Sequence, residues 1–345
     1  KTYVKPAGYV QTKDYKKELE SLKRYPTPHV CPYQLVVENE KTIQGVRQYF
    51  HSSLSSRLST LPFMTKIEKK WITYQLLVYL EKAEKWGLFH GDLKCENVML
   101  TSWNWIFVTD HAFAYKPLYL PNQNDGGFSY FFDTSNRTCY MAPERFYGTD
   151  SAPPPSSTSN DDEAETLKLG DRKAKMDVFS MGCVIAELWL EQDKRLFEFG
   201  SLLRYKQGSD DPLAILNYIQ EPSVRQLVQD MVHRDPEQRR NAGSYIKQWN
   251  GTLFPTYFET LHDAISKILT SDSNERVRRI SVSLEDLHKL FTDKQTLSSS
   301  TTRFIQASMP PAPSTPLSTS QSQSGATGIT TSGLKDTSSS PFADA

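Results

Sequence analysis

The sequence His-Gly-Asp-Leu-Lys-Cys-Glu-Asn-Val-Met-Leu at residues 90–100 is the part of the chain that decides its fold. It places an acid, Asp92, a cation, Lys94, and an amide, Asn97, at fixed spacing in a polar loop. The apolar run 98–100 follows at once and predicts a short strand. Taken alone, these residues also fit a polar surface loop, so the interpretation depends on what the rest of the chain carries.

Composition limits the class of protein. The chain has 345 residues, which is room for one large domain or two ordinary ones. Its 40 Lys and Arg residues balance its 40 Asp and Glu residues, so no global basic field favours nucleic acid as a partner. The four cysteines are widely spread, without metal-ligand spacing or a disulfide framework, and we expect a reducing, intracellular setting. No apolar run is long enough to span a bilayer, and no signal peptide is visible.

A second acid, Asp110, follows the next apolar run, 106–108. Phosphoryl transfer needs a carboxylate beside the attacking hydroxyl and oxygen ligands for Mg²⁺. Asp92 has the position of that catalytic base, and Lys94 that of a cation which neutralises the transferred phosphoryl group. Asn97 and Asp110 have the positions of the metal and cofactor ligands. The ordered set is typical of a protein kinase that uses ATP, or another purine triphosphate, with Mg²⁺.

Two further motifs have structural roles in such a kinase. Met-Ala-Pro-Glu at 141–144 matches the Ala-Pro-Glu that ends an activation segment, and Arg239 is placed to pair with Glu144 if that carboxylate is buried. Asp177 opens an apolar helical pattern, at the place where kinases hold the catalytic-loop backbone. A simple helix amino-cap is the alternative reading of Asp177.

The pattern predicts an α+β, bilobal protein-kinase-like fold with a truncated small lobe and a mostly helical large lobe. We expect a small-lobe helix that Pro26 ends, a long helix with an apolar stripe and Gly87 as its cap, and irregular aromatic sequence over 111–140. The elements we expect from the sequence are a helix at 14–25, strands at 34–38 and 42–46, a helix at 65–86, strands at 98–100 and 106–108, and helices from 177 onward.

Three regions are expected along the chain. Residues 1–262 form the kinase-like domain, with a Pro/Ser-rich and acidic disordered insertion at about 150–168. Residues 263–297 form a helical segment, with an amphipathic helix at about 274–291, that would be the start of helical repeats. Residues 298–345 are rich in Ser, Thr and Pro and form a disordered tail, because they cannot bury enough apolar surface to offset ordering entropy.

The amino-terminal residues bear on nucleotide binding. Kinases pair a strand lysine with a glutamate on the following helix, so that the lysine anchors the α- and β-phosphates. Lys1 falls where that lysine is expected, and Glu18 is a better partner than Glu20. A surface lysine and a solvated helix face are the alternative. With Lys1 in this role, we expect the chain to be a fragment whose glycine-rich loop and any lipidation signal lie upstream.

Several aromatic strings carry a closer resemblance. These are Met-Leu-Thr-Ser-Trp-Asn-Trp at 99–105, Lys-Pro-Leu-Tyr-Leu-Pro at 116–121, Phe-Ser-Tyr-Phe-Phe-Asp-Thr-Ser at 128–135 and Arg-Thr-Cys-Tyr-Met-Ala-Pro-Glu-Arg-Phe at 137–146. They resemble the regulatory protein-kinase subunit of the class III phosphatidylinositol 3-kinase complex, a vacuolar protein sorting serine/threonine kinase. The resemblance covers roughly residues 1–291, and that family also has His-Gly-Asp at the catalytic loop.

The resemblance implies a membrane-associated scaffold kinase. Its expected partners are the class III phosphatidylinositol 3-kinase catalytic subunit and a Beclin-type subunit, in autophagy and in endosomal or vacuolar sorting. Membrane association would come through the family's amino-terminal lipid anchor, and no nucleic acid is expected. The expected location is cytoplasmic, peripheral on endosomal and autophagic membranes.

Gly91 stands where most kinases have an arginine that pairs with a phosphorylated activation-segment residue. We therefore predict that phosphorylation at Thr134, Ser135 or Thr138 does not switch this protein by the common route, and that the aromatic run 128–132 packs the segment in a fixed pose.

The sequence is compatible with three functions. The first is an active serine/threonine protein kinase, which Asp92, Lys94, Asn97 and Asp110 favour. The second is a nucleotide-binding pseudokinase scaffold with little or no phosphoryl transfer. It is favoured by Gly91 and by His-Ala at 111–112, where kinases have Phe-Gly. The third is a lipid kinase, which ranks lowest because the aromatic strings match the regulatory partner.

Overall fold

Residues 35–46 build the centre of a small antiparallel sheet. The computed structural model describes residues 2–4, 15–25, 27–111, 116–122, 125–132, 134, 137–148, 154, 163–191, 194–286 and 288–289. Strands β1 (Thr2–Val4), β2 (Leu35–Glu38) and β3 (Thr42–Val46) pair in the order β1-β3-β2. Asn39 closes the turn between β2 and β3, because its side-chain oxygen accepts the backbone N–H groups of Lys41 and Thr42.

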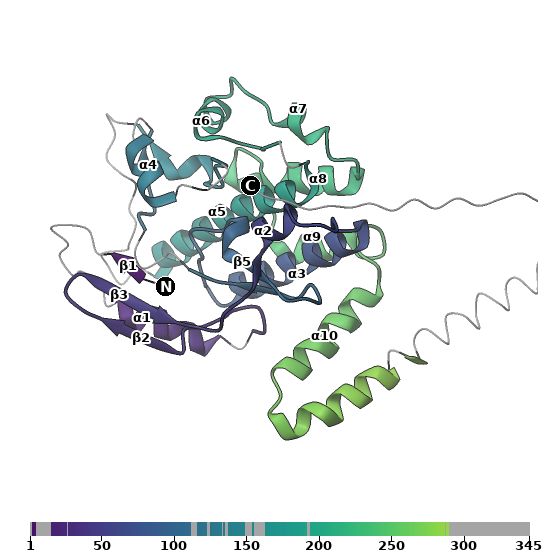
Figure 1. Ribbon diagram of the computed structural model, residues 1–345. Helices are drawn as coiled ribbons and strands as arrows, with labels where there is room; N and C mark the ends of the chain where they lie inside the picture. The colour runs from purple at the N-terminus through teal and green to yellow at the C-terminus, as the bar shows by residue number, and fades with distance from the viewer. Residues whose placement is uncertain are drawn as a thin grey trace, which may run out of the picture. The chain divides into compact units, whose positions relative to one another are not determined.

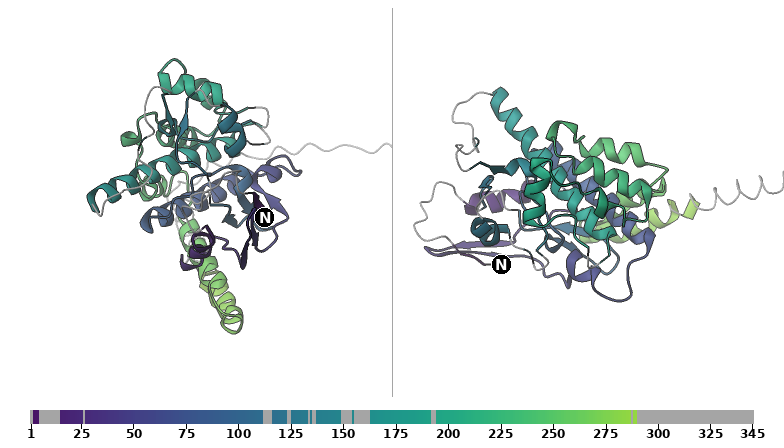
Figure 2. Two further views of the ribbon diagram at one scale, coloured as in Figure 1. Left: turned by 90° about the vertical axis from the view of Figure 1, so that its left-hand side faces the viewer. Right: turned by 90° about the horizontal axis from the view of Figure 1, so that it is seen from above.

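One face of this sheet forms a separate small core. Helix α1 (Tyr15–Ser21) lies beside β2, and it is followed by the 3₁₀ turn η1 (Leu22–Arg24). The buried side chains are Leu19, Tyr33, Val36 and Ile43. Gly45 makes room for Tyr33, since a Cβ there would lie 2.5 Å from its ring. In Figures 1 and 2 this sheet and α1 gather on one side of the helices.

The second core is helical, and two buried helices run through it. Helix α3 (Lys66–Lys85) begins at a capping box between Thr65 and Glu68, and Gly87, at φ +63°, follows its end. Helix α5 (Glu163–Trp189) is buried from Met176 to Ala186 and again at Leu188. The surrounding helices are α2 (Leu54–Leu58), α6 (Phe199–Gln207), α7 (Leu213–Leu216), α8 (Pro222–Met231), η4 (Pro236–Gln238), α9 (Ala242–Trp249) and α10 (Tyr257–Leu269).

A short hairpin positions the catalytic-type loop against this core. The 3₁₀ turn η2 (Cys95–Asn97) leads into β5 (Val98–Leu100), which pairs with β6 (Ile106–Val108) in the register Val98↔Val108. Strand β4 (Ser52–Ser53) extends the sheet on the other side of β5. The remaining elements are β7 (Leu120–Pro121), α4 (Asp125–Phe132), η3 (Pro143–Arg145) and β8 (Phe146–Tyr147).

Aromatic and imidazole rings join α10 to α3 and to the β5–β6 hairpin. His29 stacks on Trp105 at 4.5 Å between ring centroids, and His262 of α10 stacks on the same indole at 5.2 Å. The Nε2 atoms of the two histidines lie 2.8 Å apart. Phe258 of α10 packs edge-on against Trp71 of α3 at 5.0 Å. Helix α10 is therefore part of the large-lobe core.

The sequence predicted strands β2, β3, β5 and β6 and the limits of α3 well, but it did not predict β1, β4, β7 or β8, and its account of the helix faces needs correction. A single apolar stripe was predicted for this helix, but α3 buries residues on nearly every side from Trp71 to Leu80, and the apolar Ile67 is 46% exposed. A helix surrounded by other elements carries no one-sided pattern. Segment 111–140, expected to be irregular, contains α4.

Helix α5 begins earlier than expected. It starts at Glu163 rather than near Asp177, so residues 163–168 of the predicted disordered insertion are helical. Most of the remaining insertion lies outside the described residues, as does the tail 298–345.

The carboxyl-terminal boundary also differs from the expected one. The predicted boundary at 262 falls inside α10, and the compact unit extends to Lys289. Residues 273–286 are helical, as predicted for the amphipathic segment. Among the helices of the described ranges, none has the length and apolarity that crossing a membrane requires.

Candidate active site

The catalytic-type loop is fixed to α5 by one buried carboxylate. Asp177 accepts the backbone N–H of His90 at 2.6 Å and that of Gly91 at 3.1 Å. This confirms the role predicted for Asp177. Burial raises the pKa of Asp177 to about 7, and the two N–H donors oppose that shift.

His90 links this loop to the strand that leads to Asp110. Its Nε2 lies 3.0 Å from the carbonyl oxygen of Thr109, and its Nδ1 accepts the backbone N–H of Asp92 at 3.2 Å. These two partners require a neutral imidazole with the proton on Nε2. The ring therefore holds the backbone of Asp92 against the end of β6.

Asp92 is nearly buried and is surrounded by donors. The side-chain amide of Asn97 donates to the Asp92 carbonyl at 2.8 Å and to its Oδ2 at 3.2 Å. Lys94 Nζ lies 4.0 Å from Oδ2, so these three predicted residues do come together. The nearest cation is one that sequence reasoning missed: Lys116 Nζ lies 2.6 Å from the same oxygen.

The β5–β6 hairpin brings the two predicted metal ligands together. The backbone N–H of Thr109 donates to the carbonyl of Asn97 at 2.9 Å, and Asp110 follows directly. The side-chain nitrogen of Asn97 is committed to Asp92, which leaves its Oδ1 as the ligating atom. An amide oxygen and a carboxylate are the donors that Mg²⁺ prefers, so the two side chains fit the metal expected there.

Asp110 also holds two groups that the sequence did not predict. The hydroxyl of Tyr33 donates to its Oδ1 at 2.7 Å, and Nη2 of Arg47 to its Oδ2 at 3.4 Å. Asp110 is 6% exposed and has φ +64°, a left-handed conformation that is uncommon for residues other than glycine. A small-lobe cation thus neutralises the carboxylate that a metal ion would otherwise contact.

His111 fills the place of the usual phenylalanine as a packing residue. It is buried, its ring centroid lies 4.4 Å from that of His90, and its Nε2 lies 3.1 Å from the Tyr79 hydroxyl. Burial lowers the pKa of His111 well below its ordinary value, so the ring is neutral. Ala112 lies outside the described residues.

The predicted phosphate-anchoring pair stays a prediction. Lys1 lies outside the described residues, and Glu18 belongs to α1 without a described side chain.

The predicted pair at the end of the activation segment is confirmed. Arg239 makes a bidentate ion pair with Glu144, at 2.7 and 3.0 Å.

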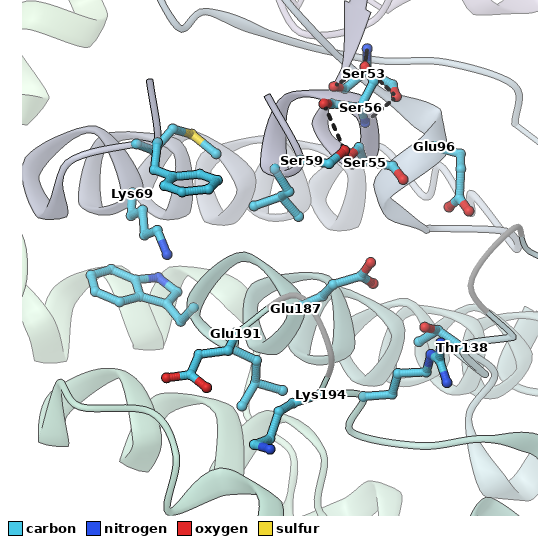
Figure 3. A pocket seen from close by; sticks show the side chains of 16 residues that line it. Ser53, Ser55, Ser56, Ser59, Lys69, Glu96, Thr138, Glu187, Glu191 and Lys194 are labelled. Carbon is cyan, nitrogen blue, oxygen red and sulfur yellow. Dashed lines mark hydrogen bonds between the residues drawn. The ribbon is translucent and has the colours of Figure 1, made fainter. Parts of the chain in front are cut away.

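A cleft of about 910 Å³ opens beside the catalytic-type loop. Figure 3 shows its serines, Ser53, Ser55, Ser56 and Ser59, on one side and Glu187, Glu191 and Lys194 on the other. Glu96 of η2 and Thr138 line it too, so the cleft adjoins both the catalytic-type loop and the segment that ends at Glu144. Its volume is in the range of binding sites, about 300–1,000 Å³.

Comparisons with known proteins identify the family of this chain. Residues 3–249 match the protein kinase domain family. The probable serine/threonine-protein kinase vps15 of Dictyostelium discoideum is 40% identical over an alignment of 309 residues, which covers 84% of this chain and 15% of that protein. Serine/threonine-protein kinase VPS15 of Arabidopsis thaliana is 40% identical over 263 residues, 75% of this chain and 17% of that protein. The crystal structure of Rad53 residues 1–466 in complex with AMP-PNP aligns with a TM-score of 0.46 at 18% identity, covering 67% of this chain and 53% of that one.

The chain therefore belongs to the protein kinase family. The relatives that it matches at 40% identity are named VPS15 serine/threonine kinases, as the aromatic strings predicted. It spans 15–17% of the length of these two relatives.

Proposed function

We propose that this chain is the kinase domain of a serine/threonine protein kinase that transfers the γ-phosphoryl group of ATP, or of another purine triphosphate, to protein hydroxyls. One observation carries the proposal: Asp92, Lys94 and Asn97 meet on a loop that Asp177 and His90 hold in place, beside Asp110.

Each side chain has a distinct task. Asp92 orients the acceptor hydroxyl and takes its proton, and Lys94 neutralises charge on the transferred group. Asn97 and Asp110 would hold Mg²⁺, and a bound Mg²⁺ would neutralise charge on the nucleotide phosphates. The cleft at Glu96 and Thr138 offers a protein acceptor a surface next to the loop.

The wider role follows from the family resemblance and the names of the relatives. The protein that carries this chain would act as the regulatory subunit of the class III phosphatidylinositol 3-kinase complex, with its catalytic subunit and a Beclin-type subunit as partners. It would work in autophagy and in endosomal or vacuolar sorting, at the cytoplasmic face of those membranes.

The test is Asp92→Asn in the full-length protein, with phosphoryl transfer, complex assembly and lipid-kinase output measured together. We expect transfer to fall by about a hundredfold or more while assembly is intact. Asp210→Asn, at an acid that pairs with Arg204 on the surface, is the matched control. Unchanged transfer in Asp92→Asn would contradict the proposal.

A pseudokinase scaffold is the second candidate. It is favoured because Asp92 and Asp110 each hold a cation of the chain itself, Lys116 and Arg47. If wild-type protein and Asp92→Asn transfer equally little phosphate and support equal lipid-kinase output, the scaffold is the correct function.

A further inference from the structure

Arg145 joins two segments that a phosphorylated residue joins in many kinases. Its guanidinium donates to the carbonyl oxygens of Gly91 at 2.8 Å, Leu118 at 2.9 Å and Pro117 at 3.1 Å. The side chain is 2% exposed. Since the three acceptors belong to the catalytic-type loop and to the segment after Asp110, one buried cation holds both segments.

Phe132 of α4 supports this cation from the side. Its ring lies 4.9 Å from the Arg145 guanidinium carbon and 4.8 Å from Lys116 Nζ. Helix α4 is itself anchored, because Phe128 stacks on Phe199 of α6 at 4.8 Å. Arg145 thus has hydrogen-bond acceptors in its plane and an aromatic face against it, an arrangement that lysine cannot reproduce.

The surrounding charges keep Arg145 ionised. Burial lowers the pKa of Arg145, and the carboxylates of Asp177 and Asp92 oppose that shift. The ordinary pKa of an arginine side chain is so high that the guanidinium stays charged despite this shift. The cation therefore lies near enough to both the residue that anchors the loop and the residue that serves as the base to feel their charge.

Most kinases order these segments by pairing an arginine at the position of Gly91 with a phosphorylated residue. Gly91 has no side chain that could bind a phosphate. It has φ +77°, and a Cβ there would lie 2.9 Å from the Phe89 ring, so a larger residue is strained. The hydroxyls of Thr134 and Thr138 belong to side chains that are 7% and 3% exposed, and Thr134 donates to the Thr138 carbonyl. Neither hydroxyl is placed to accept a phosphate in this conformation.

We propose that Arg145 is a positioning residue that orders the catalytic-type loop and the segment after Asp110 without phosphorylation. It acts through the carbonyl of Gly91, and so it sets the position of Asp92. The effect on rate rests on the proposed kinase function, whereas the effect on order does not.

The test compares Arg145→Lys and Phe132→Leu with wild type in the full-length protein. Amide hydrogen exchange over residues 90–97 and 116–122 reports order, and kcat and the nucleotide KM report catalysis. Arg225→Lys is the matched control, because Arg225 also donates to a backbone carbonyl, that of Ile219, but contacts neither segment. Wild type treated with a protein phosphatase completes the set.

In Arg145→Lys we expect about tenfold faster exchange in both segments and a kcat lower by about ten- to hundredfold, with the nucleotide KM unchanged. Phe132→Leu, which keeps all three carbonyl acceptors, should change in the same direction by less. It decides the question if Arg145→Lys does not fold. Arg225→Lys and phosphatase-treated wild type should exchange like untreated wild type.

Two results would overturn the proposal. One is an amide exchange rate in Arg145→Lys equal to that in the Arg225→Lys control. If Arg145→Lys does not fold, the same comparison is made with Phe132→Leu. The other is loss of protection in wild type after phosphatase treatment. If wild type transfers no phosphate, the kinase function fails instead, and the exchange measurements still decide whether Arg145 orders the loop.

Discussion

The Nζ atom of Lys116 lies 2.6 Å from Oδ2 of Asp92, closer than the 4.0 Å of Lys94. An acceptor hydroxyl needs that oxygen, so Lys116 must move aside when a protein acceptor binds. Both partners are mostly buried, at 12% and 8% exposed, which strengthens the pair relative to one at the surface.

Replacing Lys116 should therefore ease acceptor binding. In Lys116→Gln we expect the KM for a protein acceptor to fall by about tenfold, which corresponds to about 1.4 kcal/mol. Steady-state phosphoryl transfer measures it, with the exposed Lys85→Gln as control. A higher acceptor KM would instead show that Lys116 helps to bind the acceptor or to stabilise the transferred group.

Removing Arg47 should strengthen metal binding at Asp110. Arg47→Gln takes away the cation at Oδ2 of Asp110 and leaves the Tyr33 hydroxyl in place. We expect the Mg²⁺ concentration for half-maximal nucleotide binding to fall by about fivefold, or about 1 kcal/mol. Binding of a fluorescent nucleotide at increasing Mg²⁺ is the measurement, and the exposed Arg24→Gln is the control. An unchanged midpoint would mean that Arg47 does not compete with the metal.

Arg239 should matter more for stability than its partner Glu144. Arg239 is fully buried and also donates to the carbonyl of His233 at 2.7 Å and that of Lys175 at 3.1 Å. Arg239→Met leaves the Glu144 carboxylate without its ion-pair partner and removes the side-chain donor from these carbonyls, at an expected cost of about 3–5 kcal/mol. Glu144→Gln keeps one acceptor and should cost about half as much. Urea unfolding compares the two variants, and equal losses would refute this ranking.

The His29–His262 pair predicts a stability that depends on pH. His29 Nδ1 lies 3.0 Å from the carbonyl of Ile106 and must donate to it, so its Nε2 accepts the N–H of His262. Burial lowers the pKa of His29 to about 3 and that of His262 to about 4, from 6.5. Between these folded-state pKa values and 6.5, the unfolded chain therefore binds more protons than the folded chain. The free energy of unfolding falls as the pH drops below about 6.5.

The expected loss is about 1.4 kcal/mol per pH unit for each proton. Urea unfolding of wild type between pH 7 and about 4.5 measures this slope. His262→Gln removes one titrating group and should reduce the slope by that amount. A wild-type slope equal to that of His262→Gln would mean that His262 does not titrate on unfolding.

Local patterns allowed much of the fold to be predicted. The β5–β6 hairpin and the limits of α3 depend on apolar runs and caps close in sequence, and these are visible without a structure. Helix α4 was missed because Gly126 and Gly127 disfavour a helix, whereas the stacking of Phe128 on Phe199 stabilises it.

The site was predicted only in part, because only the contacts between residues close in sequence leave a pattern in the sequence. Asp92, Lys94 and Asn97 lie within one loop, so their spacing is a sequence signal. Lys116 reaches Asp92 across 24 residues, and Tyr33 reaches Asp110 across 77. Such contacts arise from how the elements pack, and no local pattern records them.

The rings around Trp105 also determine where the folded unit ends. The family match ends at residue 249, yet Phe258 and His262 of α10 cover Trp71 and Trp105. A protein shortened to the family boundary would expose those two indoles to water, and the loss of covered apolar surface favours aggregation. The smallest soluble fragment should therefore extend through Leu269, some twenty residues beyond the family match.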